Sequence, residues 1–140
     1  IAALEATLRL YIDGTEIKIP PIAYLLRSVQ EIQAVAEKVC EKLRDIMDGL
    51  AMVMMEYGTS QVGSGALPVE TVESAYVVLI PTNVSVDRLA ALFRSCQVPV
   101  IGRVYEGSLL MDMRTIQWEN AEYIIKAAES VSSQLRGNQS

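Results

Sequence analysis

Residues 28 to 57 read SVQEIQAVAEKVCEKLRDIMDGLAMVMMEY, and this stretch decides the fold class. Ser28 and Glu31 have the spacing of a capping box, in which each side chain accepts a hydrogen bond from the other residue's backbone amide. Apolar residues then recur at helical spacing as far as Met47, which predicts an amphipathic helix. Gly49 stands where a left-handed glycine commonly ends a helix. The short, dense apolar run AMVMMEY that follows is typical of a strand.

The sequence on either side supplies the remaining elements. Upstream, residues 1–11 have helical spacing, and a short apolar segment follows Pro20-Pro21. Downstream, the patterns predict a strand over 74–82, a helix capped by Asn83 or Ser85, a hairpin over 98–116 that turns at Tyr105-Glu106-Gly107, and a last helix from about Trp118 to Leu135. We therefore expect a single α+β domain over residues 1–140, with helices packed on one face of a small, mostly antiparallel sheet.

Composition excludes several classes of protein. Hydrophobic residues make up 51% of the chain, which argues against intrinsic disorder, and the apolar runs are too short to span a membrane. The net charge of −5 argues against a nucleic-acid platform that binds by electrostatics. The absence of histidine removes histidine-based triads and histidine metal ligands, and no metal-ligand pattern is present. The isolated cysteines Cys40 and Cys96 fit reduced thiols in a cytoplasmic protein.

The first residues indicate a piece of a larger protein. The chain begins with Ile1 rather than methionine, and it is already helical there without a capping residue. Together with the large apolar fraction, this start leads us to expect a fragment whose bare apolar surface is covered by another domain.

Three segments carry a resemblance to a known family. They are AALEATLRLY at residues 2–11, the glycine-rich SQVGSGALPVE at 60–70, and VPVIGRVYEGSLLMDMRTI at 98–116. In this order they resemble the C-terminal domain of bacterial selenocysteine synthases, the L-seryl-tRNA(Sec) selenium transferases. The chain departs from the family pattern at residues 72–74, where a proline is usual, and in a shorter stretch over 13–19.

The resemblance implies a fold-type-I pyridoxal phosphate enzyme that converts seryl-tRNA(Sec) to selenocysteyl-tRNA(Sec) with selenophosphate. It implies that the Schiff-base lysine lies in a large domain upstream of this chain, so that the fragment has no catalytic residue of its own and is inactive alone. It also implies a homo-oligomer in the cytoplasm, a missing large domain as the main partner, tRNA(Sec) contacts mainly outside this domain, and no membrane partner.

Arg103 and Arg114 are the candidate substrate-binding residues. The resemblance implies that an arginine of the small domain lies over the active site, and a guanidinium offers a planar fork to anionic oxygens. Arg114 has an alternative role, because residues two apart on a strand share a face and Asp112 could simply pair with it.

Ser60, Gly63 and Gly65 belong to the glycine-rich loop that we expect near the active site. The amides of such a loop could hold an anion. The alternative is a bend that lets the chain pass close to the large domain.

Two other functions stay open at this point. One is the small domain of a related pyridoxal phosphate lyase that acts on an amino sugar or an amino acid. The other is a free-standing α+β module that binds a ligand or a partner.

Overall fold

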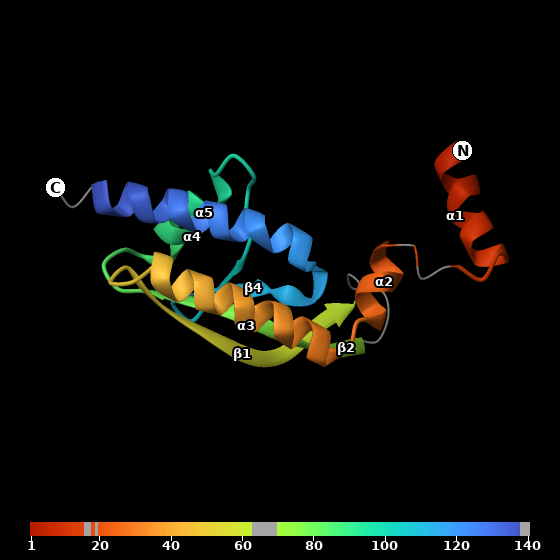
Figure 1. Ribbon diagram of the computed structural model, residues 1–140, viewed down its shortest axis with the longest axis horizontal. Coiled ribbons are helices and arrows are strands. Elements are labelled where there is room, and N and C mark those ends of the chain that lie inside the picture. Colours follow the sequence, from red (N-terminus) through yellow and green to blue (C-terminus); the bar gives the residue numbers. More distant parts are fainter. Residues whose placement is uncertain (16–17, 19, 63–69, 138–140) are drawn as a thin grey trace.

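The structure is a computed structural model that describes residues 1–15, 18, 20–62 and 70–137. Its elements, in chain order, are α1 (Ala2–Ile12), α2 (Pro20–Leu26), α3 (Val29–Ile46), β1 (Ala51–Val62), β2 (Glu70–Pro81), α4 (Val86–Arg94), β3 (Arg103–Tyr105), β4 (Ser108–Asp112), the 3-10 turn η2 (Met113–Thr115) and α5 (Trp118–Gly137). Figure 1 shows their arrangement.

The described strands form one antiparallel sheet in the order β1-β2-β4-β3. The long hairpin of β1 and β2 pairs Ala51 with Pro81 at one end and Val62 with Glu70 at the other. The short hairpin of β3 and β4 turns through Glu106 and Gly107, which both have positive φ, as the tight two-residue turn requires.

Helices α3, α4 and α5 cover one face of this sheet. The side chains of Val77 on β2 and Leu109 on β4 belong to the same buried cluster as Leu43 of α3, Phe93 of α4 and Val131 of α5. Figure 1 shows α3 and α5 side by side, and the two helices are in contact. This arrangement confirms the predicted α+β class with helices on one face.

The opposite face of the sheet carries no such layer in the described residues. Tyr76 and Val78 of β2 and Leu110 of β4 form a small separate apolar cluster there, because alternate residues of a strand point to opposite faces. We call this side the open face. Helix α2 lies beyond one end of it, and its main contact with the rest of the described chain is η2.

Helix α1 stands apart from the body in Figure 1 and buries none of its residues. Leu4, Leu8, Tyr11 and Ile12 are each more than half exposed. An exposed apolar helix of this kind is typical of a segment that contacts another surface.

Several boundaries differ from those that the sequence predicts. Residues 20–26, expected only as an apolar segment, form helix α2, in which Pro20 and Pro21 occupy the first turn, where a missing amide hydrogen costs nothing. The capping box of Ser28 and Glu31 is present as predicted, and Gly49 has the expected positive φ.

The strands around the glycine-rich segment are longer than predicted. β1 continues through Ser60 to Val62, and β2 begins at Glu70, so both ends of the segment expected as a loop are strand. The second strand of the short hairpin, in contrast, ends at Asp112 instead of continuing to Ile116. Residues 113–115 form η2, so Arg114 does not lie on a strand.

Candidate functional site

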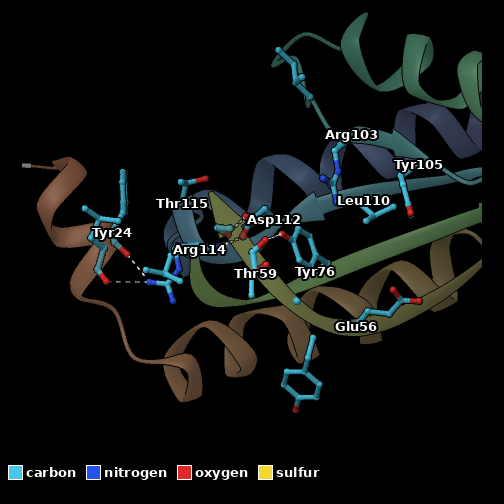
Figure 2. Close-up of a pocket in the computed structure, with 17 residues that line it drawn as sticks. Tyr24, Glu56, Thr59, Tyr76, Arg103, Tyr105, Leu110, Asp112, Arg114 and Thr115 are labelled. Carbon is cyan, nitrogen blue, oxygen red and sulfur yellow. Dashed lines mark hydrogen bonds between the residues drawn. The ribbon is translucent and has the colours of Figure 1, made fainter. Parts of the chain in front are cut away.

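The open face of the sheet forms the floor of a hollow with a volume of about 860 Å³. Its floor comes from β1, β2, β4 and β3, one wall from Tyr24 and Leu25 of α2, and one rim from the segment that leads into β3. Figure 2 shows Tyr24 on one side of this hollow, Arg103 and Tyr105 on the other, and Asp112 and Tyr76 between them. We refer to this site below as the hollow.

Arg103 presents an exposed guanidinium to the hollow. It pairs with Leu110 across the β3–β4 ladder, and directly paired residues share a face, so its side chain lies over the open face. The guanidinium carbon lies 5.5 Å from the centre of the Tyr105 ring. The ion pairs of the described residues, Arg9–Glu5 and Lys126–Glu122, do not involve Arg103. Its charge is therefore available to an anion.

Tyr105 adds a neutral hydroxyl beside this cation. Hydrogen bonding to Glu106, followed by the negative charge of the same carboxylate, raises the pKa of Tyr105. A phenol with a raised pKa keeps its proton at neutral pH and acts as a hydrogen-bond donor or acceptor rather than as a base.

Arg114 also reaches the hollow, but it is only 5% exposed. Its Nη1 donates to the carbonyl oxygens of Tyr24 at 3.0 Å, Leu25 at 3.2 Å and Arg27 at 3.2 Å, and its Nη2 donates to that of Glu73. Its Nε is buried and has no hydrogen-bond partner among the described residues. The guanidinium is thus largely occupied by backbone carbonyls.

The pairing of Asp112 with the Arg114 guanidinium, the alternative that the sequence suggested, is wrong. The Asp112 carboxylate instead accepts a hydrogen bond of 2.9 Å from the backbone amide of Arg114. The reason is that the chain leaves the strand at Asp112, so the two side chains do not lie on one face of a strand.

Asp112 joins three strands at the floor of the hollow. One carboxylate oxygen accepts from the hydroxyl of Ser74 on β2 at 2.5 Å, and the other accepts from the hydroxyl of Ser60 on β1. Ser60 therefore lies in the hollow, at the end of β1 rather than in a loop. Gly63 and Gly65, the other residues predicted in this segment, lie outside the described residues.

Tyr76 and Gly58 complete the floor of the hollow, and neither was among the site residues predicted from the sequence. The Tyr76 hydroxyl donates to the carbonyl oxygen of Thr59 at 2.7 Å, which carries the ring across β1 above Gly58. A Cβ at Gly58 would lie 2.6 Å from a carbon of that ring. A glycine inside a strand is the sequence signal that marks such a close approach.

The described residues that line the hollow do not provide an amine for a covalent cofactor. The lysines of the chain are Lys18, Lys38, Lys42 and Lys126, and none of them lines the hollow. Within the described residues, acidic and cysteine side chains do not gather in threes as a metal site would require. None of the helices in the described part of the chain has the length and apolar character to cross a membrane.

Comparison with known proteins gives a consistent result. The family model described as L-seryl-tRNA selenium transferase matches residues 1–117. The L-seryl-tRNA(Sec) selenium transferase of Methylocella silvestris is 39% identical over 120 residues, which cover 83% of this chain and 26% of that protein. The enzyme of Desulfomicrobium baculatum is 35% identical over 129 residues, 91% of this chain and 27% of that protein. The Escherichia coli enzyme is 38% identical over 124 residues, 85% of this chain and 27% of that protein.

The chain thus spans roughly a quarter of the length of these relatives. The family match extends through all three segments that carry the resemblance in the sequence, and it confirms that resemblance. This chain belongs to the L-seryl-tRNA selenium transferase family.

Proposed function

We propose that this chain is the part of a selenium transferase that closes over the reaction centre and helps to bind an anionic substrate. The complete enzyme converts seryl-tRNA(Sec) to selenocysteyl-tRNA(Sec) with selenophosphate as the selenium donor. The observation that carries the proposal is the exposed Arg103 guanidinium above the open face of the sheet, in a chain of this family. Anionic oxygens of the donor or of the tRNA end are the groups that a guanidinium binds best.

Pyridoxal phosphate, when bound, supplies the electron sink for the reaction at the seryl side chain. The described lining of the hollow has arginines, hydroxyls and carboxylates but no lysine, so it fits a surface that faces this cofactor rather than one that attaches it. The Schiff-base lysine and the main phosphate contacts belong to a large domain. The chain alone is therefore inactive and binds no cofactor covalently.

The residues of the hollow have separate roles in this proposal. Arg103 binds the anion, and the neutral hydroxyl of Tyr105 next to it provides a hydrogen bond. Arg114 acts mainly through position, because its guanidinium already donates to the carbonyls that end α2. Ser60 holds the end of β1 to Asp112. Together with Gly63 and Gly65, it belongs to the segment that the family resemblance implies near the active site.

The net charge and the exposed apolar surface of this chain support the binding partners that we propose for it. The missing large domain covers the apolar side of α1, and the enzyme acts as a homo-oligomer in the cytoplasm. The tRNA is bound mainly by other parts of the enzyme, since this chain carries a net charge of −5 and would repel phosphates at long range. Residues 1–140 form a single small domain, with α1 as its connection to the large one.

The family match favours this function over the two alternatives that the sequence left open. A free-standing module would not be expected to match a selenium transferase model over residues 1–117. Among the described residues that line the hollow, none favours an amino sugar or amino acid lyase over a selenium transferase.

The direct test uses the complete gene product that carries this chain. It is loaded with pyridoxal phosphate and incubated with radiolabelled seryl-tRNA(Sec) and selenophosphate, and the amino acid released from the tRNA is identified. We expect selenocysteine from the complete protein and none from residues 1–140 alone. A cofactor-loaded complete protein that leaves the seryl group unchanged would refute the proposed function.

A further inference from the structure

Two arginines from distant parts of the chain each donate a side-chain hydrogen bond to the backbone carbonyl of the other. Arg27 lies between α2 and α3, and its Nη1 donates to the carbonyl oxygens of Met113 at 3.2 Å, Arg114 at 2.8 Å and Ile116 at 2.7 Å. Arg114, in η2, donates in turn to the carbonyl oxygen of Arg27 and to two carbonyls of α2. We call this reciprocal set of bonds the arginine clasp.

The clasp satisfies backbone groups that a helix leaves unpaired. The last carbonyls of a helix have no partner within it, and they form the negative end of its dipole. In α2 these include Tyr24 and Leu25, which the Arg114 guanidinium caps. On the other side, Arg27 caps the carbonyls of η2 and of Ile116, directly after it. A cation at each of these ends is electrostatically favourable.

Neither cation has an acidic partner among the ion pairs of the described residues, which are Arg9–Glu5 and Lys126–Glu122. Arg114 is 5% exposed, so its charge is compensated by backbone dipoles whose positions depend on the fold. A buried charge held in this way strongly favours the one arrangement in which the carbonyls converge on it. The clasp therefore fixes α2 relative to η2.

The position of α2 matters because α2 forms a wall of the hollow. Tyr24 and Leu25 line it, and η2 contributes Arg114 and Thr115 to the same end. Figure 2 shows the bonds from Arg114 to the α2 carbonyls at this end of the hollow. Helix α2 makes its main contact with the rest of the described chain through η2, so little else holds it in place.

We propose that Arg27 is a positioning residue of the enzyme: through the arginine clasp it holds α2 against η2 and sets the width of the hollow. Its function in turnover rests on the proposed function above, whereas the clasp itself does not. Arg27 contacts no substrate in this proposal. A lysine should replace it only in part, because its ammonium has three donors but ends a shorter side chain than the one that brings Arg27 Nη1 to three carbonyls.

The clasp is tested by amide hydrogen exchange on the complete gene product that carries this chain. We expect Arg27→Ala to accelerate exchange in the peptide spanning residues 20–27 by about tenfold or more, since it removes three charge-assisted hydrogen bonds. The core of α3, around Ile32 to Leu43, should exchange as in the wild type. In residues 20–27, Arg27→Lys should exchange at a rate between those of the wild type and Arg27→Ala. The matched control is Arg44→Ala, which removes an arginine–carbonyl bond of 3.1 Å to Val53 far from α2.

The positioning role is tested by steady-state kinetics of the complete gene product. We expect Arg27→Ala to raise KM for selenophosphate by about fivefold or more with kcat within about twofold, because a displaced wall weakens binding rather than chemistry. Arg44→Ala should change neither constant. Equal acceleration of exchange in α2 and α3, or unchanged exchange in α2, would overturn the clasp. Faster exchange in α2 with an unchanged KM would overturn the positioning role.

These outcomes separate the two proposals. If the wild-type complete protein transfers no selenium, the proposed function fails while the exchange experiment still decides the clasp. If the wild type is active and the Arg27 variants behave like Arg44→Ala in both experiments, the clasp fails while the proposed function stands.

Discussion

Arg103 and Arg114 differ in burial far more than in sequence context. Both lie in the segment 98–116, and both carry a guanidinium that suits anions. The structure leaves Arg103 exposed over the open face, whereas Arg114 is buried and bonded to backbone carbonyls. The difference arises from a single boundary, because β4 ends at Asp112 and η2 turns Arg114 away from the ladder.

Gly58 gives a prediction at the level of one atom. Gly58→Ala places a Cβ 2.6 Å from the Tyr76 ring, which is buried and held by its bond to Thr59. We expect a loss of about 1–3 kcal/mol in the free energy of unfolding, as for overpacked sites. Denaturant unfolding of Gly58→Ala and of the wild type measures this loss of free energy. Gly137→Ala, where an added Cβ meets nothing within 4 Å, serves as the control. A Gly58→Ala midpoint equal to that of the wild type would contradict the packing described here.

Glu31 gives a prediction about pH. The hydrogen bond from the backbone amide of Ser28, then that from its hydroxyl, lowers the pKa of Glu31 from its ordinary value of 4.5. A carboxyl with a lowered folded-state pKa stabilises the fold above the unfolded-state pKa, and this contribution is lost as the pH falls through the folded-state value. Stability should therefore decline as the pH drops below about 4.5, and Glu31→Gln should make that decline shallower.

Urea titrations between neutral pH and acid measure this effect. Glu41→Gln is the matched control, because Glu41 is exposed on the same helix but makes no cap. An acid-induced decline as steep in Glu31→Gln as in the wild type would show that the capping box does not contribute to it.

Single residues of the site were predictable only in part from the sequence. The capping box and Gly49 follow local rules, and the structure has both as predicted. The partners of the Arg114 and Arg27 guanidinium groups were not predictable, because their bonds join residues 41 to 90 positions apart and a local sequence pattern carries no information over such a separation.

At the scale of elements, Asp112 connects β1, β2 and β4 through side chains rather than through the ladder. Asp112→Ala leaves the hydroxyls of Ser60 and Ser74 and the amide of Arg114 without their acceptor. We expect it to lower the free energy of unfolding by about 2–3 kcal/mol, and Asp112→Asn to cost about half as much, since an amide oxygen remains.

Thermal or denaturant unfolding checks this prediction. Asp45→Ala, an exposed change on α3, should stay within about 0.5 kcal/mol of the wild type. If Asp112→Ala behaves like Asp45→Ala, the carboxylate does not hold the strands together.

Elements with a strong period were predicted well, and short ones were not. The long helix over 28–47 and the hairpin turn at residues 106–107 are each marked by sequence signals that lie within a few residues of one another. Helix α2 was missed, because seven residues that begin with two prolines have too few turns to show a period, and its carbonyls are satisfied by a distant arginine. The strands β1 and β2 run further into the glycine-rich segment than their apolar residues do, since backbone pairing and Asp112 extend them.

At the scale of the whole molecule, the layers explain where function can lie. Helices α3, α4 and α5 cover one face of the sheet, and the other face forms the floor of the hollow. The fold class could be predicted from the sequence because the helices and strands follow in a clear order. The hollow could not, because it is formed by strands, by α2 and by η2, which meet only in three dimensions.

In the function proposed above, the open face binds an anion through Arg103 during selenium transfer. The most direct measurement is kcat/KM for selenophosphate of the complete gene product, compared between Arg103→Ala and Arg88→Ala, an exposed arginine of α4 outside the hollow. We predict a fall of about 10- to 100-fold for Arg103→Ala, the loss of a charge-assisted contact, and no change for Arg88→Ala. Equal kcat/KM in both variants and in the wild type would contradict anion binding by Arg103.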